Sequence, residues 1–245
     1  MGMLHEAMQF YHCINKAATP ADIAEIMTDI TQALGFQYFA LTQHVADPGR
    51  QAIHIHNYPE PWADIYAADR LSLSDPVHRA CDRTSWGFQW ASIPSLVPMS
   101  RRDKEQLLRG RKAGIGDGFT VPAGVRGEPP GSCTFANASN VPLRQDMLFV
   151  AQLVGSYAFH MARQLISVKS ASTGTVTITD RQRDCVRWAA RGKGDWEISQ
   201  ILGISKETAT SHVKGACARY QVNKRIALIG PMLDDGTLTI SDLFP

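Results

Sequence analysis

The sequence predicts an α+β chain in two parts. An amino-terminal α/β/α sandwich with an antiparallel sheet is followed by a small all-α domain of four helices. In residues 1–166, segments with strand-like alternation are separated by segments with helical spacing, as in layered α and β structure. Residues 167–177 are small and polar and lack periodicity, which is typical of a flexible linker. Residues 178–245 show helical spacing only.

The composition excludes several kinds of protein. The chain has 245 residues, 44% of them hydrophobic, which is enough for one sizeable core and a small helical domain. Apolar windows are too short for a membrane span, and polar residues interrupt the amino terminus, so neither a membrane protein nor a signal peptide is expected. The five cysteines are scattered without a C-x-x-C pair, which predicts reduced thiols in a cytoplasmic protein and no metal site.

The elements of the first part follow from the spacing of apolar residues. A helix is expected over about Ala21–Leu34, and strands near Phe36–His44 and Ala52–Asn57. Alternation in the second strand puts His54 and His56 together on its polar face, where we expect solvated side chains and no metal. Helices separate the remaining expected strands, Trp86–Ala91, Gly118–Pro122 and Ser132–Ala136. Such a sheet can enclose a small-molecule pocket beneath one helical layer.

One cluster in this part has the chemistry of a ligand site. Tyr58, Trp62 and Tyr66 are spaced by four residues, so one helical face can present three rings with polar tips. Such rings suit a mostly apolar ligand that carries a few carbonyl groups. The carboxylate of Asp75 can accept a hydrogen bond from a ligand amide, and Trp90 follows in the chain. By spacing alone, an aromatic stripe of this kind is more often part of an ordinary core than of a ligand site.

A long apolar stripe precedes the linker. It starts near Pro142 and has helical spacing, with the members Leu143, Met147, Val150, Val154, Tyr157, Met161 and Leu165. The stripe is wide enough to cover a sheet and to continue into a second subunit. We therefore expect this helix to be buried in part and to contribute to a homodimer.

The second part contains a helix-turn-helix pattern over Glu197–Tyr220. A tight Gly203–Ile204 turn separates two short helices, and Ser205 is a suitable N-cap for the second. A preceding helix begins with the capping-box pattern of Thr179–Gln182, and Asn223 can cap a last helix. Together these elements predict a compact helical domain that places one helix in the major groove of DNA.

The second helix of this motif has a polar side that suits DNA. Its candidate contacts are Lys206, Thr210, Ser211, His212 and Lys214. Thr210 and Lys214 are placed for base edges, and the other three for the DNA backbone. Residues 178–230 hold ten Lys or Arg against five Asp or Glu, whereas the first 175 residues hold fifteen of each. This local basic excess favours double-stranded DNA as the partner over a merely solvated helix face.

Three motifs in the second part carry a resemblance to a known family. They are Ile178-Thr179-x-Arg181-Gln182, Trp188-Ala189-Ala190-x-Gly192-Lys193 and Glu197-Ile198-x-x-Ile201-Leu202-Gly203-Ile204-Ser205. This pattern is similar to the DNA-binding domain of LuxR-type transcriptional regulators. The resemblance implies that residues 178–245 bind a palindromic promoter operator as a homodimer, with RNA polymerase as a further partner.

The first part extends this resemblance. Its motifs are Tyr58-Pro59-x-x-Trp62-x-x-x-Tyr66, Asp75-Pro76-Val77, Ala113-Gly114-Ile115-x-x-Gly118 and Gly131-Ser132-Cys133-Thr134-Phe135. They resemble the autoinducer-binding domain of acyl-homoserine lactone receptors, which implies that residues 1–166 bind an N-acyl-homoserine lactone and no other cofactor. By the same resemblance, Trp62 donates to the lactone carbonyl and Asp75 accepts from the amide N–H. Tyr58 and Thr134 bind the amide carbonyl, and Tyr66 and Trp90 pack against the ring and chain head.

Three other kinds of protein are alternatives to this interpretation. A LuxR-type regulator that senses a different small molecule, or none, fits the same pattern and stays open. A phosphorylation-controlled response regulator needs an acidic pair after the first strand, which Phe36–Asp47 does not offer. An enzyme needs a nucleophile–base pair or paired carboxylates, and the charges of Arg101–Glu105 are expected to form a solvated helix face. We therefore expect a non-enzymatic, ligand-responsive transcriptional regulator of quorum sensing in the cytoplasm.

Overall fold

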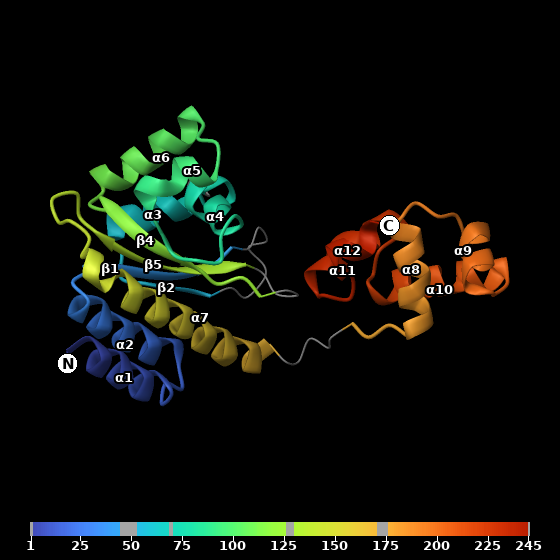
Figure 1. The fold of residues 1–245 in the computed structure, drawn as a ribbon, viewed down its shortest axis with the longest axis horizontal. Coiled ribbons are helices and arrows are strands. Elements are labelled where there is room, and N and C mark those ends of the chain that lie inside the picture. Colours follow the sequence, from blue (N-terminus) through green and yellow to red (C-terminus); the bar gives the residue numbers. More distant parts are fainter. Residues whose placement is uncertain (1, 45–52, 69–70, 126–129, 171–175, 245) are drawn as a thin grey trace. The chain divides into compact units, whose positions relative to one another are not determined.

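An antiparallel sheet forms the centre of the amino-terminal part (Figure 1). The computed structural model describes residues 2–44, 53–68, 71–125, 130–170 and 176–244, and the chain divides near residue 172 into two compact units. Over the described residues the sheet has five strands in the order β2-β1-β5-β4-β3. The strands are β1 (Tyr38–Gln43), β2 (His54–His56), β3 (Phe88–Gln89), β4 (Asp117–Pro122) and β5 (Gly131–Asn137).

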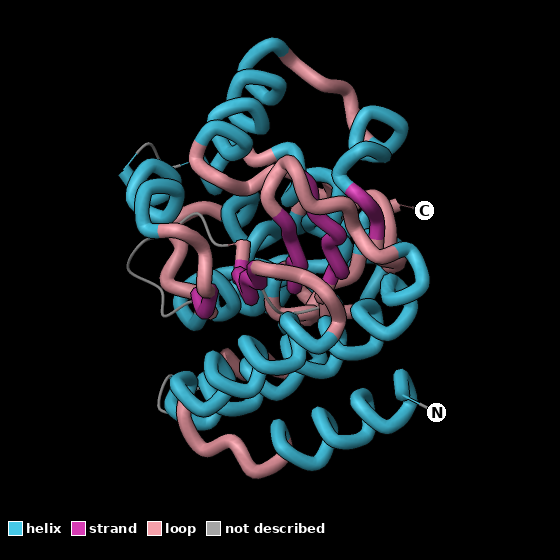
Figure 2. The backbone as a smooth tube through the Cα atoms, turned by 90° about the vertical axis from the view of Figure 1, so that its left-hand side faces the viewer, coloured by secondary structure: helices cyan, strands magenta, loops and turns pink. Residues whose placement is uncertain are grey.

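Helices cover both faces of this sheet (Figures 1 and 2). One layer contains α1 (Gly2–Ile14), α2 (Pro20–Ala33) and α7 (Leu148–Ser170). The other contains α3 (Glu60–Ala68), α4 (Pro76–Cys81), α5 (Ile93–Leu96) and α6 (Arg101–Lys112), with the 3-10 turns η1 (Leu71–Ser74) and η2 (Trp90–Ser92). A third 3-10 turn, η3 (Gln145–Met147), leads into α7. The predicted α/β/α sandwich is confirmed.

The two faces of the sheet differ in chemistry because side chains alternate along each strand. The face toward α2 and α7 carries apolar residues such as Phe39, Leu41 and Phe135, all fully buried in the main core. The opposite face carries Thr42, His54 and other polar residues. The main core therefore lies on one side of the sheet, and the polar side is left for a site.

Several predicted boundaries needed correction. The strand expected over Trp86–Ala91 is limited to β3, because the chain turns into η2 at Trp90, whose indole Nε1 donates to Thr120 Oγ1 (2.9 Å). Within the predicted strand Ala52–Asn57, only His54–His56 is strand, and Ala52 lies outside the described residues. Helix α1 was not predicted, because its polar residues hid the apolar side that contacts α2 and α7.

Helix α7 also differs from the prediction at both ends. The helical stretch starts with η3 at Gln145, not near Pro142, and α7 continues to Ser170. The predicted linker 167–177 was therefore wrong over its first four residues. The predicted stripe packs on the core of its own unit, and the exposed apolar residues are instead Phe149 and Leu153.

The second unit is entirely helical over its described residues. Its elements are α8 (Asp180–Ala190), α9 (Asp195–Leu202), α10 (Lys206–Arg219), η4 (Arg225–Leu228), α11 (Ile229–Asp234) and α12 (Ile240–Leu243). The last predicted helix starts with η4 after Lys224, so Asn223 is not its N-cap. The short α12 was not predicted; its Asp242 forms an ion pair with Arg187 of α8 (2.9 Å).

Two further predictions concern the whole chain. None of the described helices is both long and apolar enough to cross a bilayer. All five cysteines are free of disulfides, and three of them, Cys81, Cys133 and Cys185, are buried. Burial raises the pKa of the Cys133 thiol, so this group packs as a neutral apolar side chain.

Candidate functional site

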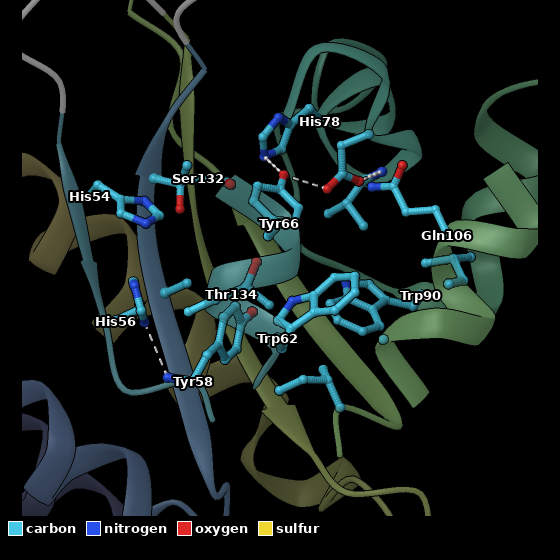
Figure 3. Close-up of a pocket in the computed structure, with 18 of the residues that line it drawn as sticks. His54, His56, Tyr58, Trp62, Tyr66, His78, Trp90, Gln106, Ser132 and Thr134 are labelled. Carbon is cyan, nitrogen blue, oxygen red and sulfur yellow. Dashed lines mark hydrogen bonds between the residues drawn. The ribbon is translucent and has the colours of Figure 1, made fainter. Parts of the chain in front are cut away.

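A cavity of about 290 Å³ lies on the polar side of the sheet (Figure 3). Its floor comes from β1, β2 and β5, and its walls from α3, α4, α6 and η2. This volume is near the lower end of the range for small-molecule sites, about 300–1,000 Å³. All six residues predicted to bind a ligand line it: Tyr58, Trp62, Tyr66, Asp75, Trp90 and Thr134. Folding thus brings together residues from five segments of the chain.

Asp75 combines a structural role with its position in the cavity. The side chain is 7% exposed, and its Oδ1 accepts a hydrogen bond from Val77 N (2.8 Å) as the N-cap of α4. Its Oδ2 accepts from the hydroxyl of Tyr66 (2.6 Å). Burial and the nearby Asp75 charge raise the pKa of Tyr66, so this hydroxyl stays protonated as a donor. The carboxylate is therefore held in one orientation, with lone pairs left for a ligand N–H.

Trp90 is fixed by a chain of hydroxyl groups. Its indole N–H donates to Thr120 Oγ1, which lies 2.9 Å from Thr134 Oγ1 on the neighbouring strand. The indole of Trp90 can pack against the backbone of residue 118 because this residue is glycine; a Cβ there would lie 2.7 Å from Trp90 Cε2. The Trp90 N–H is already used by the protein, so its ring face is what remains for a ligand.

Tyr58 and Trp62 lie on different elements. Trp62 and Tyr66 belong to α3, but Tyr58 precedes that helix, so the prediction of three rings on one helical face was wrong. The rings still converge, because β2 and α3 both border the cavity (Figure 3). Trp62 is 8% exposed, and its indole N–H has no hydrogen-bond partner among the described residues. That donor is therefore available to a ligand oxygen.

Histidines form a part of the cavity that the sequence analysis left out of the site. His54, expected to be solvated, is exposed and His56 is half-buried, but both line the cavity, as does His78. His78 stacks on His44 with ring centroids 3.6 Å apart, and His44 Nε2 lies 3.0 Å from Ser132 Oγ. Burial, with a smaller effect of His78, lowers the pKa of His44 to about 2, so its ring is neutral at ordinary pH.

The charged start of α6 is not merely a solvated helix face. Asp103 is buried and closes a capping box with Ser100, whose backbone N–H donates to its Oδ2 (2.7 Å). The same oxygen accepts from Arg79 Nη2 of α4 (2.7 Å). These hydrogen bonds to Ser100 and Arg79 outweigh burial and hold the pKa of Asp103 below its usual value. This ion pair joins the two helices that form one wall of the cavity. Arg101 and Glu105 do form an exposed pair, as expected.

Helix α10 presents most of its predicted DNA contacts to solvent. Lys206, Ser211 and Lys214 are exposed, and His212 is half-buried. The helix packs against α8 and α9 through the buried residues Ala209, Val213 and Ala216. The preceding turn is as predicted, with Gly203 in the left-handed region (φ 64°) and Ser205 Oγ accepting from Thr208 N (3.0 Å).

Thr210 has a contact that the sequence did not predict. Its hydroxyl donates to Asp195 Oδ2 at the start of α9 (2.7 Å), and Arg225 Nη1 donates to the other carboxylate oxygen (3.2 Å). The Thr210 proton is thus used within the domain, where it links the two helices of the motif. Its oxygen lone pair and methyl group remain for a base.

Two comparisons with protein families cover both units. The sequence model of the autoinducer binding domain matches residues 19–165, which is more than half of the chain. The sequence model of bacterial regulatory proteins of the luxR family matches residues 176–230. The chain belongs to the LuxR family of quorum-sensing transcriptional regulators.

Relatives of this LuxR-family regulator match over nearly its whole length. The quorum sensing-dependent transcriptional regulator RpaR of Rhodopseudomonas palustris is 25% identical, covering 96% of this chain and 95% of RpaR. The transcriptional activator LuxR of Aliivibrio fischeri is 24% identical, covering 93% and 94% of the two chains. These relatives are transcriptional regulators, in agreement with the prediction that this chain is not an enzyme.

The solved structure of Escherichia coli SdiA shares the fold. Its TM-score is 0.68 at 21% identity, covering 94% of this chain and 97% of SdiA. A second SdiA structure, with a TM-score of 0.67 and 20% identity, covering 94% of this chain and 93% of SdiA, is a complex with octanoyl-rac-glycerol. At this level of identity the likeness concerns the fold.

Sequence reasoning missed several residues that line the cavity of this regulator. They include Thr42, His78, Gln106 and Ser132, besides the two histidines of β2. Alternation indicates Ser132, because it lies two residues before Thr134 on the same strand. No sequence signal indicates His78 or Gln106, since only the packing of α4 and α6 turns them toward the cavity. In the described part of the chain no group of three or more His, Cys, Asp or Glu can hold a metal ion.

Proposed function

We propose that this regulator binds an N-acyl-homoserine lactone in the cavity and, as a homodimer in the cytoplasm, binds a palindromic promoter operator. The main support for this proposal is that one cavity is lined by all six residues that the family resemblance assigns to the ligand, although they lie in distant segments of the chain. Among them are one fixed acceptor, Asp75, and one donor, Trp62 Nε1, that has no hydrogen-bond partner among the described residues. A lactone amide needs such an acceptor, and a lactone carbonyl needs such a donor.

The ligand pose that follows uses each of these groups once. The lactone carbonyl accepts from Trp62, and the amide N–H donates to Asp75. Tyr58 and Thr134 bind the amide carbonyl, while the rings of Tyr66 and Trp90 pack against the lactone and the chain head. Burial and the Asp75 charge raise the pKa of Tyr58, which supports a neutral hydroxyl donor.

Ligand binding stabilises the folded unit in this proposal. A hollow between the sheet and α3–α6 lacks packing on one side, and a buried acyl chain contributes about 0.8 kcal/mol per methylene. A lactone present at 100 times its Kd stabilises the protein by about 2.7 kcal/mol. For a unit of this size, that corresponds to a rise in Tm of about 5–10 °C.

The homodimer would use an exposed apolar patch. Phe149 and Leu153 of α7 are 62% and 51% exposed, and the ring of Trp86, 59% exposed, lies 6.5 Å from that of Phe149. Contiguous exposed apolar side chains of this kind are typical of an interface. Phe149→Ser should lower the dimer fraction in light scattering, whereas Leu108→Ser, at an exposed leucine of α6, should not.

The DNA contacts are proposed for α10. Lys206, Ser211 and His212 would bind the DNA backbone, and Thr210 and Lys214 would contact base edges. The exposure of Lys206, Ser211 and Lys214 and the local basic excess support this assignment. RNA polymerase is a further partner of the regulator bound at a promoter.

A regulator that senses a different small molecule is the second candidate. SdiA in complex with octanoyl-rac-glycerol motivates it, since that ligand offers an acyl chain and hydroxyls instead of a lactone. The two ligand classes differ in one respect that the cavity can test. An acyl glycerol has no amide N–H to donate to Asp75.

The deciding experiment identifies the ligand directly. The full chain is expressed with a mixed lactone panel, purified and extracted, and the extract is identified by mass spectrometry. We expect a lactone at near-stoichiometric amounts in the wild type and less in Trp62→Phe, which loses the donor but keeps a ring. Recovery of no lactone, together with an unchanged Tm on adding the panel, would contradict the proposal. A Tm rise with octanoylglycerol alone would favour the second candidate.

A further inference from the structure

The side chains on the floor of the cavity become more polar from one end of the strands to the other. The register pairs Ala40 of β1 with His56 of β2 and Thr134 of β5. Two residues further along β1, Thr42 pairs with His54 and Ser132. The first row contains an alanine at its centre, whereas the second row has only polar side chains. The rows are about 7 Å apart, which is two residues of strand.

The two ends of the cavity differ in the same way (Figure 3). Trp62, Trp90 and Ile115 lie at the end near the first row, within an apolar cluster. At the other end, His78 of α4 lies over the second row and stacks on His44, which contacts Ser132. Ser132 is 2% exposed, so its side of the polar end is a buried wall of the cavity, whereas His54 on the other side of the row is exposed.

The polar end also lacks a basic Lys or Arg side chain among the described residues. None of the described residues that line the cavity is a Lys or an Arg, so an anionic ligand group would have no basic counter-ion there. Burial lowers the pKa of His54 and of His56, which favours the neutral rings. The ring of His54 then offers one donor and one acceptor, whereas Nδ1 of His56 already accepts from Tyr58 N (3.3 Å). Thr42 adds a hydroxyl that has no hydrogen-bond partner among the described residues.

A bare alkyl chain fits this end poorly. In the proposed pose the lactone occupies the aromatic end, so the acyl group extends over the second row. Methylene groups there would displace water from Thr42 and His54 without replacing its hydrogen bonds, which costs free energy. A site built to hydrogen-bond a ligand hydroxyl rejects the analogue that lacks it.

We infer that the acyl group of the ligand carries an uncharged hydroxyl at its far end, bound by Thr42 and His54. This inference rests on the proposed function and specifies the ligand class of the same cavity. The hydroxyl lies about 7 Å beyond the amide carbonyl, because that is the spacing between the Thr134 row and the Thr42 row.

The test uses matched lactone pairs on the full chain. The pairs are N-hexanoyl with N-(6-hydroxyhexanoyl) and N-octanoyl with N-(8-hydroxyoctanoyl) homoserine lactone, and Kd is measured by calorimetry. We expect the hydroxylated member of at least one pair to bind tenfold or more tightly than its alkyl counterpart. Equal or weaker binding of both hydroxylated lactones overturns the inference and leaves the proposed function intact. If no lactone of either series binds, the proposed function fails as well.

Variants locate the effect within the cavity. Thr42→Val keeps the shape of the side chain and removes its hydroxyl, and His54→Phe keeps a ring. Each should reduce the preference for the hydroxylated lactone severalfold while leaving binding of the alkyl lactone equal or tighter. Ser156→Ala, on the exposed side of α7, is the control and should keep the full preference. A preference that survives in both cavity variants contradicts the assigned position.

Discussion

Replacing Asp75 separates the stability of the cavity wall from its ligand chemistry. In Asp75→Ala, α4 loses its N-cap to Val77, which costs about 1 kcal/mol. The variant also loses the charged acceptor of the Tyr66 hydroxyl, and a hydrogen bond to a charged group contributes about 1.5–3 kcal/mol. His78 Nε2, 3.4 Å from the Tyr66 hydroxyl, compensates for little of this lost hydrogen-bond energy. We therefore expect Asp75→Ala to lower the free energy of unfolding by about 2–4 kcal/mol.

Asp75→Asn is the matched variant, because Asn caps helices as well as Asp does. Its amide oxygen can still accept from Val77, and its amide nitrogen can donate to the oxygen of Tyr66. We expect a loss of less than about 1 kcal/mol in the absence of ligand. Lactone affinity should nevertheless fall by about 1–3 kcal/mol, because the ligand N–H loses its charged acceptor.

The assay is urea denaturation of both variants without ligand, followed by calorimetric titration with a lactone that binds the wild type. The reasoning is refuted if Asp75→Ala is as stable as the wild type, or if Asp75→Asn is destabilised to the same extent. Unchanged lactone affinity in Asp75→Asn would remove Asp75 from the ligand site and leave only its capping role.

Three other predictions follow from the structure. Gly118→Ala puts a Cβ against the indole of Trp90, so lactone affinity should drop at least tenfold in calorimetry while far-UV circular dichroism stays unchanged. The pKa of His44 is lowered to about 2 in the folded protein, so between this value and about pH 6.5 the unfolded chain binds a proton that the folded chain does not. The free energy of unfolding should therefore fall as the pH drops below about 6.5, by at most about 1.4 kcal/mol per pH unit. His44→Gln should reduce this dependence in denaturation experiments at about pH 4.5–7. Lys214→Ala should weaken operator binding in fluorescence anisotropy and spare ligand uptake, whereas Lys104→Ala, an exposed lysine of the other unit, should alter neither.

The sequence by itself determined the elements and their chemistry. The capping box of Thr179 and Gln182 and the Gly203 turn are local features, since each needs only neighbouring residues, and the structure has both. The alternation of the strands likewise needs no distant contact, so the sheet and its two different faces were predictable. Where a local signal was weak, as at α1, the prediction failed.

Only the tertiary structure decided how the site is assembled. Trp90 leaves its predicted strand because Thr120, thirty residues later, accepts its N–H. His54 becomes part of a cavity wall because the register of β1 with β2 and β5 sets it in one row with Ser132. Helix α4 brings His78 over that row. Such contacts join residues far apart in the chain, and their geometry depends on the packing of whole layers, which no local pattern encodes.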